Sequence, residues 1–383
     1  MTSRERVLSA LARTGYDRLP IKHEGTPEVN DALMGHFGLA NMEQLLRVVG
    51  DDFRYVQPVY LGPELRTFPD GSVEGFWGER YNYQAFEGGR YLESVYQPFA
   101  GLESLDQLDR SHFPSAGWFD YSTIKDQCQR LGDRFAVGFG SAGDLDFING
   151  IGRARGAEQV LVDLATDSEV YLEIMDARFR FFYETHERAL QAAGGLIDIV
   201  HVGEDLGLQR GPLIRMETFE KHFAPKYGAY FQMAHRYGAK TMMHMCGCVE
   251  KFLPRLIELG LDIQDVVQPT TPEMDIAYLQ SHYGQRLNFC GTMCVQTVLP
   301  HGTAAEVEAE VRRRQKLFPR GGLIFGPTHA IQVGTPLQNV LAMYRAAGSL
   351  TEKIDETILS IRGDEFPDQS NRAKLTKASD TGK

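Results

Sequence analysis

Short apolar runs alternate with longer amphipathic segments from about residue 130 onward. The apolar runs are bounded by polar or glycine residues and predict buried strands over 135–140, 196–203, 239–244, 262–267, 287–291 and 322–326. The segments between them carry apolar positions at helical spacing and predict helices over 157–164, 168–192, 216–237, 249–259, 274–283 and 304–318. Strands that alternate with helices at this spacing indicate parallel βαβ units.

The number of strands favours a closed barrel. With a further strand near 19–23 and another position before Gly150, the count approaches eight, so we predict an α/β fold, a distorted (β/α)8 TIM barrel, rather than an open doubly wound sheet. The 383 residues are long enough for one large domain. We assign residues 1–365 to that domain, with 1–130 as an N-terminal extension and first barrel elements, 131–350 as the main barrel, and 366–383 as a polar tail.

The first 130 residues are less regular. Their pattern predicts helices over 3–13, 27–37 and 41–49. A β-hairpin is expected across 65–83, with Asp70-Gly71 as its turn.

Composition excludes several classes of protein. The formal net charge of −11 argues against a nucleic-acid surface, which usually needs a basic patch. The N-terminus lacks the continuous apolar core of a signal peptide, and the chain has no run of apolar residues long enough for a membrane span. Five cysteines make an odd count rather than a disulfide framework, so we expect a cytoplasmic protein with free thiols.

The strongest chemical signal is His244-Met245-Cys246, directly after the predicted strand 239–244. Side chains alternate along extended backbone, so the imidazole and the thiol point the same way. Imidazole nitrogen and thiolate sulfur are preferred zinc ligands. The alternative is a core histidine beside small buried cysteines, because free cysteine is among the most buried residue types.

Other strand ends are also polar, and in a barrel the C-terminal ends of the strands meet at one mouth. His244, Cys246 and His329 would give a zinc ion three ligands and an open position, with Cys294, Glu204 or water as a fourth. Glu204 and Asp205 would orient ligands or manage a proton. The remaining candidates would bind substrate: Gln209, Gln268, Cys294 and Gln332. For His329, direct substrate binding or helix capping is an alternative, and Cys294 would equally suit a buried apolar position.

Four stretches in this order resemble the uroporphyrinogen decarboxylase superfamily: GEDLGLQRGPLI (203–214), HMCG (244–247), LNFCGTMCVQTVLPHGT (287–303) and LIFGPTHAIQVGTPLQNVLAMY (323–344). The resemblance covers nearly the whole chain, including DRLPIKHEGTPEV (17–29) and DGSVEGFWG (70–78). It implies a single distorted barrel with an N-terminal helical extension.

Two chemistries compete within that superfamily. The decarboxylases hold substrate carboxylates with an arginine-rich loop of the form RQAGR, where this chain has Lys22-His23-Glu24-Gly25-Thr26. The zinc-dependent corrinoid methyltransferases instead carry His-x-Cys, which falls on His244 and Cys246. Their third ligand, typically Cys, falls on His329. The resemblance therefore implies Zn²⁺, a cobalamin carried by a partner corrinoid protein, and a small O- or N-methylated substrate.

Two other functions stay open on the sequence. One is a metal-free decarboxylase or lyase of a carboxylated ring, with Asp205 and His329 binding substrate. The other is a non-catalytic corrinoid or tetrapyrrole carrier. The sequence leaves the methyl donor, the acceptor, the direction of transfer and the oligomeric state undetermined, with a homodimer as one arrangement.

Overall fold

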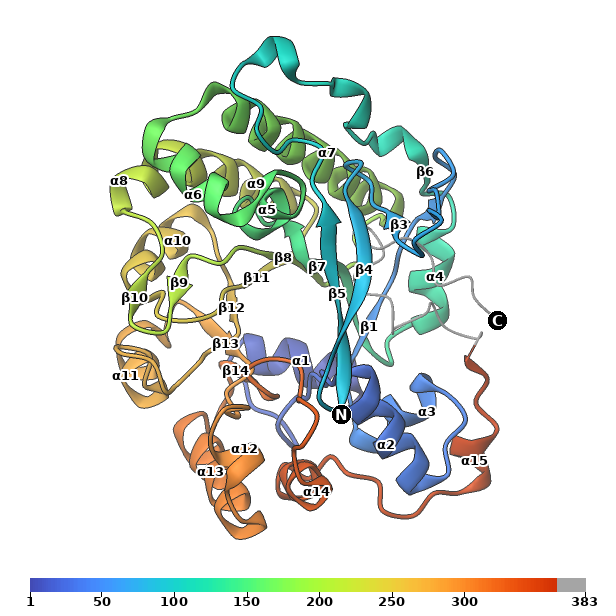
Figure 1. Cartoon of the computed structure of the whole chain (residues 1–383). Helices are drawn as coiled ribbons and strands as arrows, with labels where there is room; N and C mark the ends of the chain where they lie inside the picture. Colours follow the sequence, from blue (N-terminus) through green and yellow to red (C-terminus); the bar gives the residue numbers. More distant parts are fainter. Residues whose placement is uncertain (364–383) are drawn as a thin grey trace.

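The computed structural model describes residues 1–363 of the chain. Within that range, parallel strands curl around a common axis in the order β1-β7-β8-β11-β12-β13-β14 (Figure 1). Their bounds are β1 Phe53–Tyr55, β7 Ala136–Leu145, β8 Ile199–Gly203, β11 Lys240–His244, β12 Ile263–Asp265, β13 Asn288–Cys290 and β14 Leu323–Ile324. The predicted α/β barrel is confirmed. The predicted tail 366–383 lies outside the described residues.

The segment 19–23 closes the barrel between β14 and β1. Ile21 forms a parallel bridge with Phe325, and the Lys22 N–H donates to the Phe325 carbonyl at 3.0 Å. On the other side, the Asp52 N–H donates to the Ile21 carbonyl at 2.9 Å. The strand expected before Gly150 is the extended end of β7, and the remaining barrel position is β1, which the pattern did not indicate.

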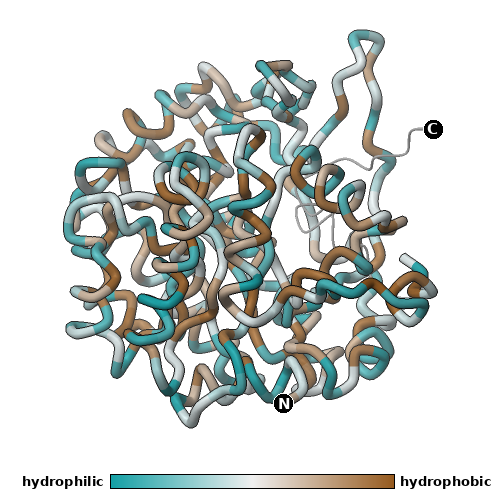
Figure 2. The backbone as a smooth tube through the Cα atoms, turned by 90° about the horizontal axis from the view of Figure 1, so that it is seen from below, coloured by the Kyte–Doolittle hydropathy of each residue, from teal (hydrophilic) through white to brown (hydrophobic). Residues whose placement is uncertain are grey.

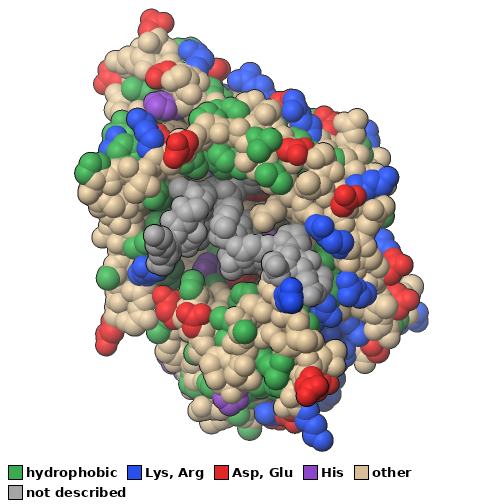
Figure 3. Space-filling model, turned by 90° about the vertical axis from the view of Figure 1, so that its right-hand side faces the viewer, with side chains coloured by type: hydrophobic (Ala, Val, Ile, Leu, Met, Phe, Trp, Pro, Cys, Tyr) green, Lys and Arg blue, Asp and Glu red, His purple; other side chains and the backbone are tan. Residues whose placement is uncertain are grey.

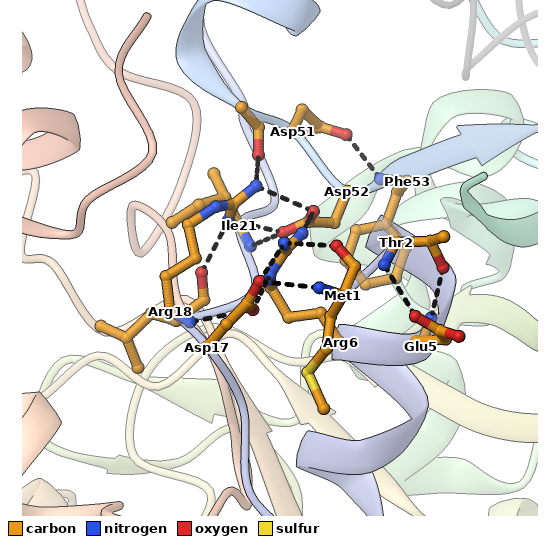
Figure 4. A network of polar contacts seen from close by, with 12 residues as sticks. Met1, Thr2, Glu5, Arg6, Asp17, Arg18, Ile21, Asp51, Asp52 and Phe53 are labelled. Atoms are coloured by element: carbon orange, nitrogen blue, oxygen red, sulfur yellow. Dashed lines mark hydrogen bonds and ion pairs between the residues drawn. The ribbon is translucent and has the colours of Figure 1, made fainter.

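A buried carboxylate holds this closure together at the N-terminal ends of the strands (Figure 4). Asp52 is fully buried and accepts hydrogen bonds from Arg6 at 2.7 Å, Arg18 at 2.9 Å and the Ile21 N–H at 2.7 Å. A buried charge needs such partners, because desolvation is costly. One side chain thus ties α1 (Ser3–Leu11), segment 19–23 and β1 to one another.

Helices surround the strand ring on its outer side (Figure 1). The predicted helices follow in order: α6 Ala157–Thr166, α7 Glu169–Ala193, α9 Ala224–Arg236, α10 Leu253–Leu259, α11 Ile276–Tyr283 and α13 Ala304–Leu317. The pattern did not indicate α14 Leu337–Ala346. Other helices are α4 Ile124–Leu131, α5 Asn149–Arg155, α8 Met216–Thr218, α12 Val298–His301 and α15 Glu356–Leu359. The helix predicted over 216–237 is one continuous path through α8, a π-helical turn at Phe219–Phe223, and α9.

The barrel interior is layered. An apolar cluster fills the N-terminal end and is contributed by α1 and the strands: Val7, Leu11, Phe53, Tyr55, Ala136, Ile199, Met242, Ile263, Cys290 and Ile324. Side chains two residues further along a strand point to the same face. His201, His244 and Asp265 therefore follow Ile199, Met242 and Ile263 as a polar layer toward the mouth.

The N-terminal extension contains α2 (Pro27–Phe37) and α3 (Met42–Val49), as predicted. The Asp70-Gly71 turn also forms, with the Phe68 N–H donating to the Ser72 carbonyl. The main hairpin lies further on, however, and consists of β4 (Arg80–Phe86) and β5 (Gly89–Tyr96), with the short β3 (Val73–Glu74) beside it. Smaller pairs are β2 Val59–Tyr60 with β6 Phe119–Asp120, and β9 Gly207–Leu208 with β10 Gly211–Pro212.

Residue hydropathy alternates along the chain. Hydrophobic and hydrophilic stretches succeed one another along the backbone tube (Figure 2). Among residues 1–363, none of the helices has the length and apolar character needed to cross a membrane. On the face shown in Figure 3, acidic and basic side chains lie among one another, which is typical of a solvated surface.

Candidate metal centre

The centre is built at the C-terminal end of β11. His244 is the last residue of the strand, and Cys246 follows it before the chain turns at Gly247. Gly247 has φ +79°, and a Cβ there would lie 2.7 Å from the backbone of Gly207. Glycine is required because the left-handed backbone and the close approach both exclude a side chain. This turn is what ends the strand.

His244 and Cys246 face each other, as the alternation predicted. Nε2 of His244 lies 3.3 Å from Sγ of Cys246. Zinc bonds of about 2.0–2.1 Å to nitrogen and about 2.3 Å to sulfur put tetrahedral ligands about 3.6 Å apart. The two atoms are therefore close to the separation that a shared zinc ion requires.

A buried carboxylate lies behind the imidazole. Oδ2 of Asp265 is 3.3 Å from Nδ1 of His244 and 3.0 Å from Nε2 of His201. Nζ of Lys22 lies 3.2 Å from each oxygen of the same carboxylate. Side chains from four segments of the barrel thus lie together: Lys22 from 19–23, His201 from β8, His244 from β11 and Asp265 from β12.

The charges in this layer set its pKa values. Burial alone would raise the pKa of Asp265, but Lys22 and the two imidazoles outweigh it and hold that pKa well below its usual range. Burial lowers the pKa of His201. It would do the same to His244, but hydrogen bonds to Asp265 and Cys246 raise the pKa of that imidazole well above its usual value.

Two sets of three side chains bring their ligand atoms within 4.8 Å of one another among the described residues. One set is Asp205, His244 and Cys246, and the other is His201, His244 and Asp265. His329 belongs to neither set. It is exposed, with its ring centroid 6.4 Å from that of His244. The structure thus places the predicted third ligand beside the pair and brings Asp205 closer to it.

Glu204 and Asp205 lie in different surroundings. Glu204 is buried and accepts hydrogen bonds from the N–H groups of Phe147 and Ile148 and from the Tyr227 hydroxyl. Burial, with a contribution from nearby acidic groups, raises its pKa well above the usual range. Asp205 is partly exposed and accepts from the Cys246 N–H at 3.4 Å and from Asn149.

The predicted substrate-binding glutamines support the surrounding loops. Gln268 accepts from the Gly247 N–H at 3.1 Å and donates to Gln209 at 3.0 Å. Gln332 accepts from the Tyr91 hydroxyl on β5 at 2.5 Å and donates to the Ala330 carbonyl. This joins the β4–β5 hairpin to the loop that carries His329.

Cys294 is buried, with Sγ 3.9 Å from the Thr270 hydroxyl. Glu24 lies at the mouth beside Lys22, at 3.2 Å. Burial would raise the pKa of Glu24, but the Lys22 ammonium outweighs it and lowers the pKa to about 2.

Sequence reasoning did not single out His201, Asp265 or Lys22 for this site. A signal existed, because each is a charged or polar residue inside a segment that is otherwise buried, and such residues need partners. Their partners lie on strands far apart in the chain, so only the closed barrel identifies them.

Comparisons with known proteins identify the family and support the fold. Residues 146–350 match the family described as Uroporphyrinogen decarboxylase (URO-D). A methylated-thiol–coenzyme M methyltransferase of Methanosarcina mazei is 28% identical over 134 residues, which are 35% of this chain and 34% of that protein. The chain thus matches about a third of the length of that relative. A solved methyltransferase structure from Methanosarcina mazei superposes with a TM-score of 0.60 at 14% identity, covering 91% of this chain and 98% of that one, which supports the fold.

Proposed function

This chain belongs to the uroporphyrinogen decarboxylase family, and from that premise we propose that it is a zinc-dependent methyltransferase. The methyl group would move between a small O- or N-methylated substrate and a cobalamin carried by a partner corrinoid protein. The observation that carries the proposal is the 3.3 Å separation between Nε2 of His244 and Sγ of Cys246. The partial match to a methylated-thiol–coenzyme M methyltransferase supports the reaction class.

The donor set fits zinc. His244 and Cys246 would hold the ion together with Asp205 or His329, and an open position would remain for the substrate. When bound, zinc would supply a Lewis acid that polarises the heteroatom bearing the methyl group. Asp265 holds Nδ1 of His244, which leaves Nε2 facing Cys246.

The acidic residues would have separate roles. Glu204 fixes the 147–148 turn through both of its oxygens, so we assign it to positioning. Where His329 completes the ligand set, Asp205, which is partly exposed beside Cys246, would relay a proton between solvent and the substrate heteroatom as the methyl group leaves or returns. Gln332 and Gln209, on loops at the mouth, would contact the rest of the substrate.

Zinc analysis of the purified protein tests the proposal. We expect about one zinc per chain in the wild type and a large loss in Cys246→Ala. Cys248→Ala is the matched control, because Cys248 lies in the same turn but its thiol donates to the Pro272 carbonyl. A wild type without zinc, or undiminished zinc in Cys246→Ala, would contradict the proposal.

An anaerobic assay then identifies the reaction. Methylation of cob(I)alamin by O-methyl and N-methyl donors, followed by absorbance, should depend on zinc and stop with a strong chelator. Turnover of a carboxylated ring in the presence of chelator would instead favour a metal-free decarboxylase. Cobalamin binding without turnover would favour a carrier.

The expected location rests on the thiols. All five cysteines are free, which supports a reducing compartment, and we propose that the protein acts in the cytoplasm.

A further inference from the structure

Lys22 is an unusual residue for the inside of a barrel. Its side chain is only 5% exposed, and lysine is almost never buried unless it is paired. Nζ lies 3.2 Å from both oxygens of Asp265 and 3.2 Å from Oε2 of Glu24. The ammonium therefore has two carboxylate partners, and it grips both oxygens of one of them.

Asp265 is the shared partner of Lys22 and both histidines of the polar layer. Its Oδ2 faces Nδ1 of His244 at 3.3 Å and Nε2 of His201 at 3.0 Å. A carboxylate on a short side chain can rotate, and its orientation decides whether either imidazole has a partner. Because Lys22 contacts both oxygens, it fixes that rotation.

We propose that Lys22 is a positioning residue for the metal centre: it orients Asp265, which in turn orients the His244 ring so that Nε2 faces Cys246. This inference rests on the proposed function. Outer partners of a metal-binding histidine commonly change metal affinity by about 10–100-fold when they are removed. Lys22 belongs to the segment that closes the barrel, so the geometry of the centre depends on that closure.

The same ammonium bears on the second ligand set. His201, His244 and Asp265 are close enough to hold a cation by themselves. Lys22 already contacts the carboxylate of that set, and its positive charge repels a divalent ion there. The metal is thereby directed to the Cys246 side of His244.

The test compares metal binding in the full chain. Lys22→Met removes the donor, and Lys22→Gln keeps a donor but removes the charge. Lys240→Met is the control, because Lys240 begins β11 at the end opposite His244 and pairs at 2.8 Å with Asp262, the residue before β12. Zinc affinity is measured by competition with a chromophoric chelator, and the visible spectrum of the Co²⁺-substituted protein reports the coordination geometry.

We expect both Lys22 variants to lose about 10–100-fold in zinc affinity and to show an altered Co²⁺ spectrum, while Lys240→Met matches the wild type. If Lys22→Met does not fold, the zinc affinity and Co²⁺ spectrum of Lys22→Gln decide whether the inference holds. Wild-type affinity and spectrum in a folded Lys22 variant would overturn the inference and leave the proposed function intact. Two zinc ions per Lys22→Met chain, with reduced affinity for the first, would support the inference and show that the ammonium also keeps a cation out of the second ligand set. A wild type that binds neither metal would refute the proposed function, and the inference with it.

Discussion

Nδ1 of His244 lies 3.3 Å from Oδ2 of Asp265, on the side of the ring away from Cys246. This contact determines which imidazole nitrogen is available to a metal. With Nδ1 held by the carboxylate, Nε2 faces the thiol. The proposed metal centre would thus depend on Asp265, a residue of β12 that would not itself bind the ion.

Asp265→Asn should weaken zinc binding by about 10–100-fold, because the amide no longer provides a charged acceptor for Nδ1. The substitution also removes the main counter-charge of the buried Lys22, so we expect a loss of about 3 kcal/mol in the free energy of unfolding. Chelator competition and urea denaturation measure the two effects. Unchanged zinc affinity in a folded Asp265→Asn protein would show that the contact has no role in metal binding.

Asp205→Asn and His329→Gln distinguish the two candidates for the third ligand. Asp205 belongs to a close ligand set with His244 and Cys246, whereas His329 lies beside His244 and is exposed. We expect Asp205→Asn to reduce zinc affinity more than His329→Gln does. The reverse order would assign the third position to His329, as its place in the sequence suggested, and equal affinities in both variants and the wild type would exclude both residues.

The sequence predicted most of the fold because barrel strands are buried on both faces and appear as apolar runs. β1 was not predicted, and the reason is specific to its sequence. Its central residue, Arg54, is fully buried and forms an ion pair with Glu43 at 2.6 Å, so the segment carries a charge where an apolar residue is expected. The hairpin was predicted too early in the chain: β4 and β5 lie around the turn at Glu87-Gly88, whereas the prediction took Asp70-Gly71 as the turn.

For the candidate site, the closeness of His244 and Cys246 could be predicted, whereas the other members of the polar layer were missed. His244 and Cys246 are two residues apart, so strand alternation alone brings them together. Lys22, His201 and Asp265 come from segments that are far apart in the chain. Only the register between strands places them at one height in the barrel, and a single sequence does not give that register.

Gly247→Ala should damage the metal centre through the backbone. The residue has φ +79°, and its Cβ would lie 2.7 Å from the backbone of Gly207. Gly238→Ala is a matched control at the other end of β11, because Gly238 has φ +81° but an open space around it. We expect about 1 kcal/mol of destabilisation for Gly238→Ala from conformation alone, and a larger loss with reduced zinc content for Gly247→Ala. Equal effects in thermal unfolding and metal analysis would show that the close approach to Gly207 is unimportant.

Asp262 lies directly before β12, at the N-terminal ends of the strands, and should make the stability of the protein depend on pH. It accepts hydrogen bonds from His235 at 2.7 Å, Lys240 at 2.8 Å and the Thr241 N–H at 2.9 Å. Burial would raise the pKa of Asp262, but these partners outweigh it and hold the pKa below its usual range. Because the folded pKa lies below the unfolded value of about 3.9, the stabilisation is complete above that value and is lost as the pH falls through the folded pKa.

Asp262→Asn should therefore lower the free energy of unfolding by about 1–3 kcal/mol at a pH near 6, and the difference from the wild type should shrink at a pH below about 3. Urea denaturation across this range measures it. Asp126→Asn, on the exposed side of α4, is the control and should change stability by less than about 0.5 kcal/mol. A difference between Asp262→Asn and the wild type that stays constant with pH would mean that the charge of Asp262 does not stabilise the strand ends, and that its hydrogen bonds alone account for the effect.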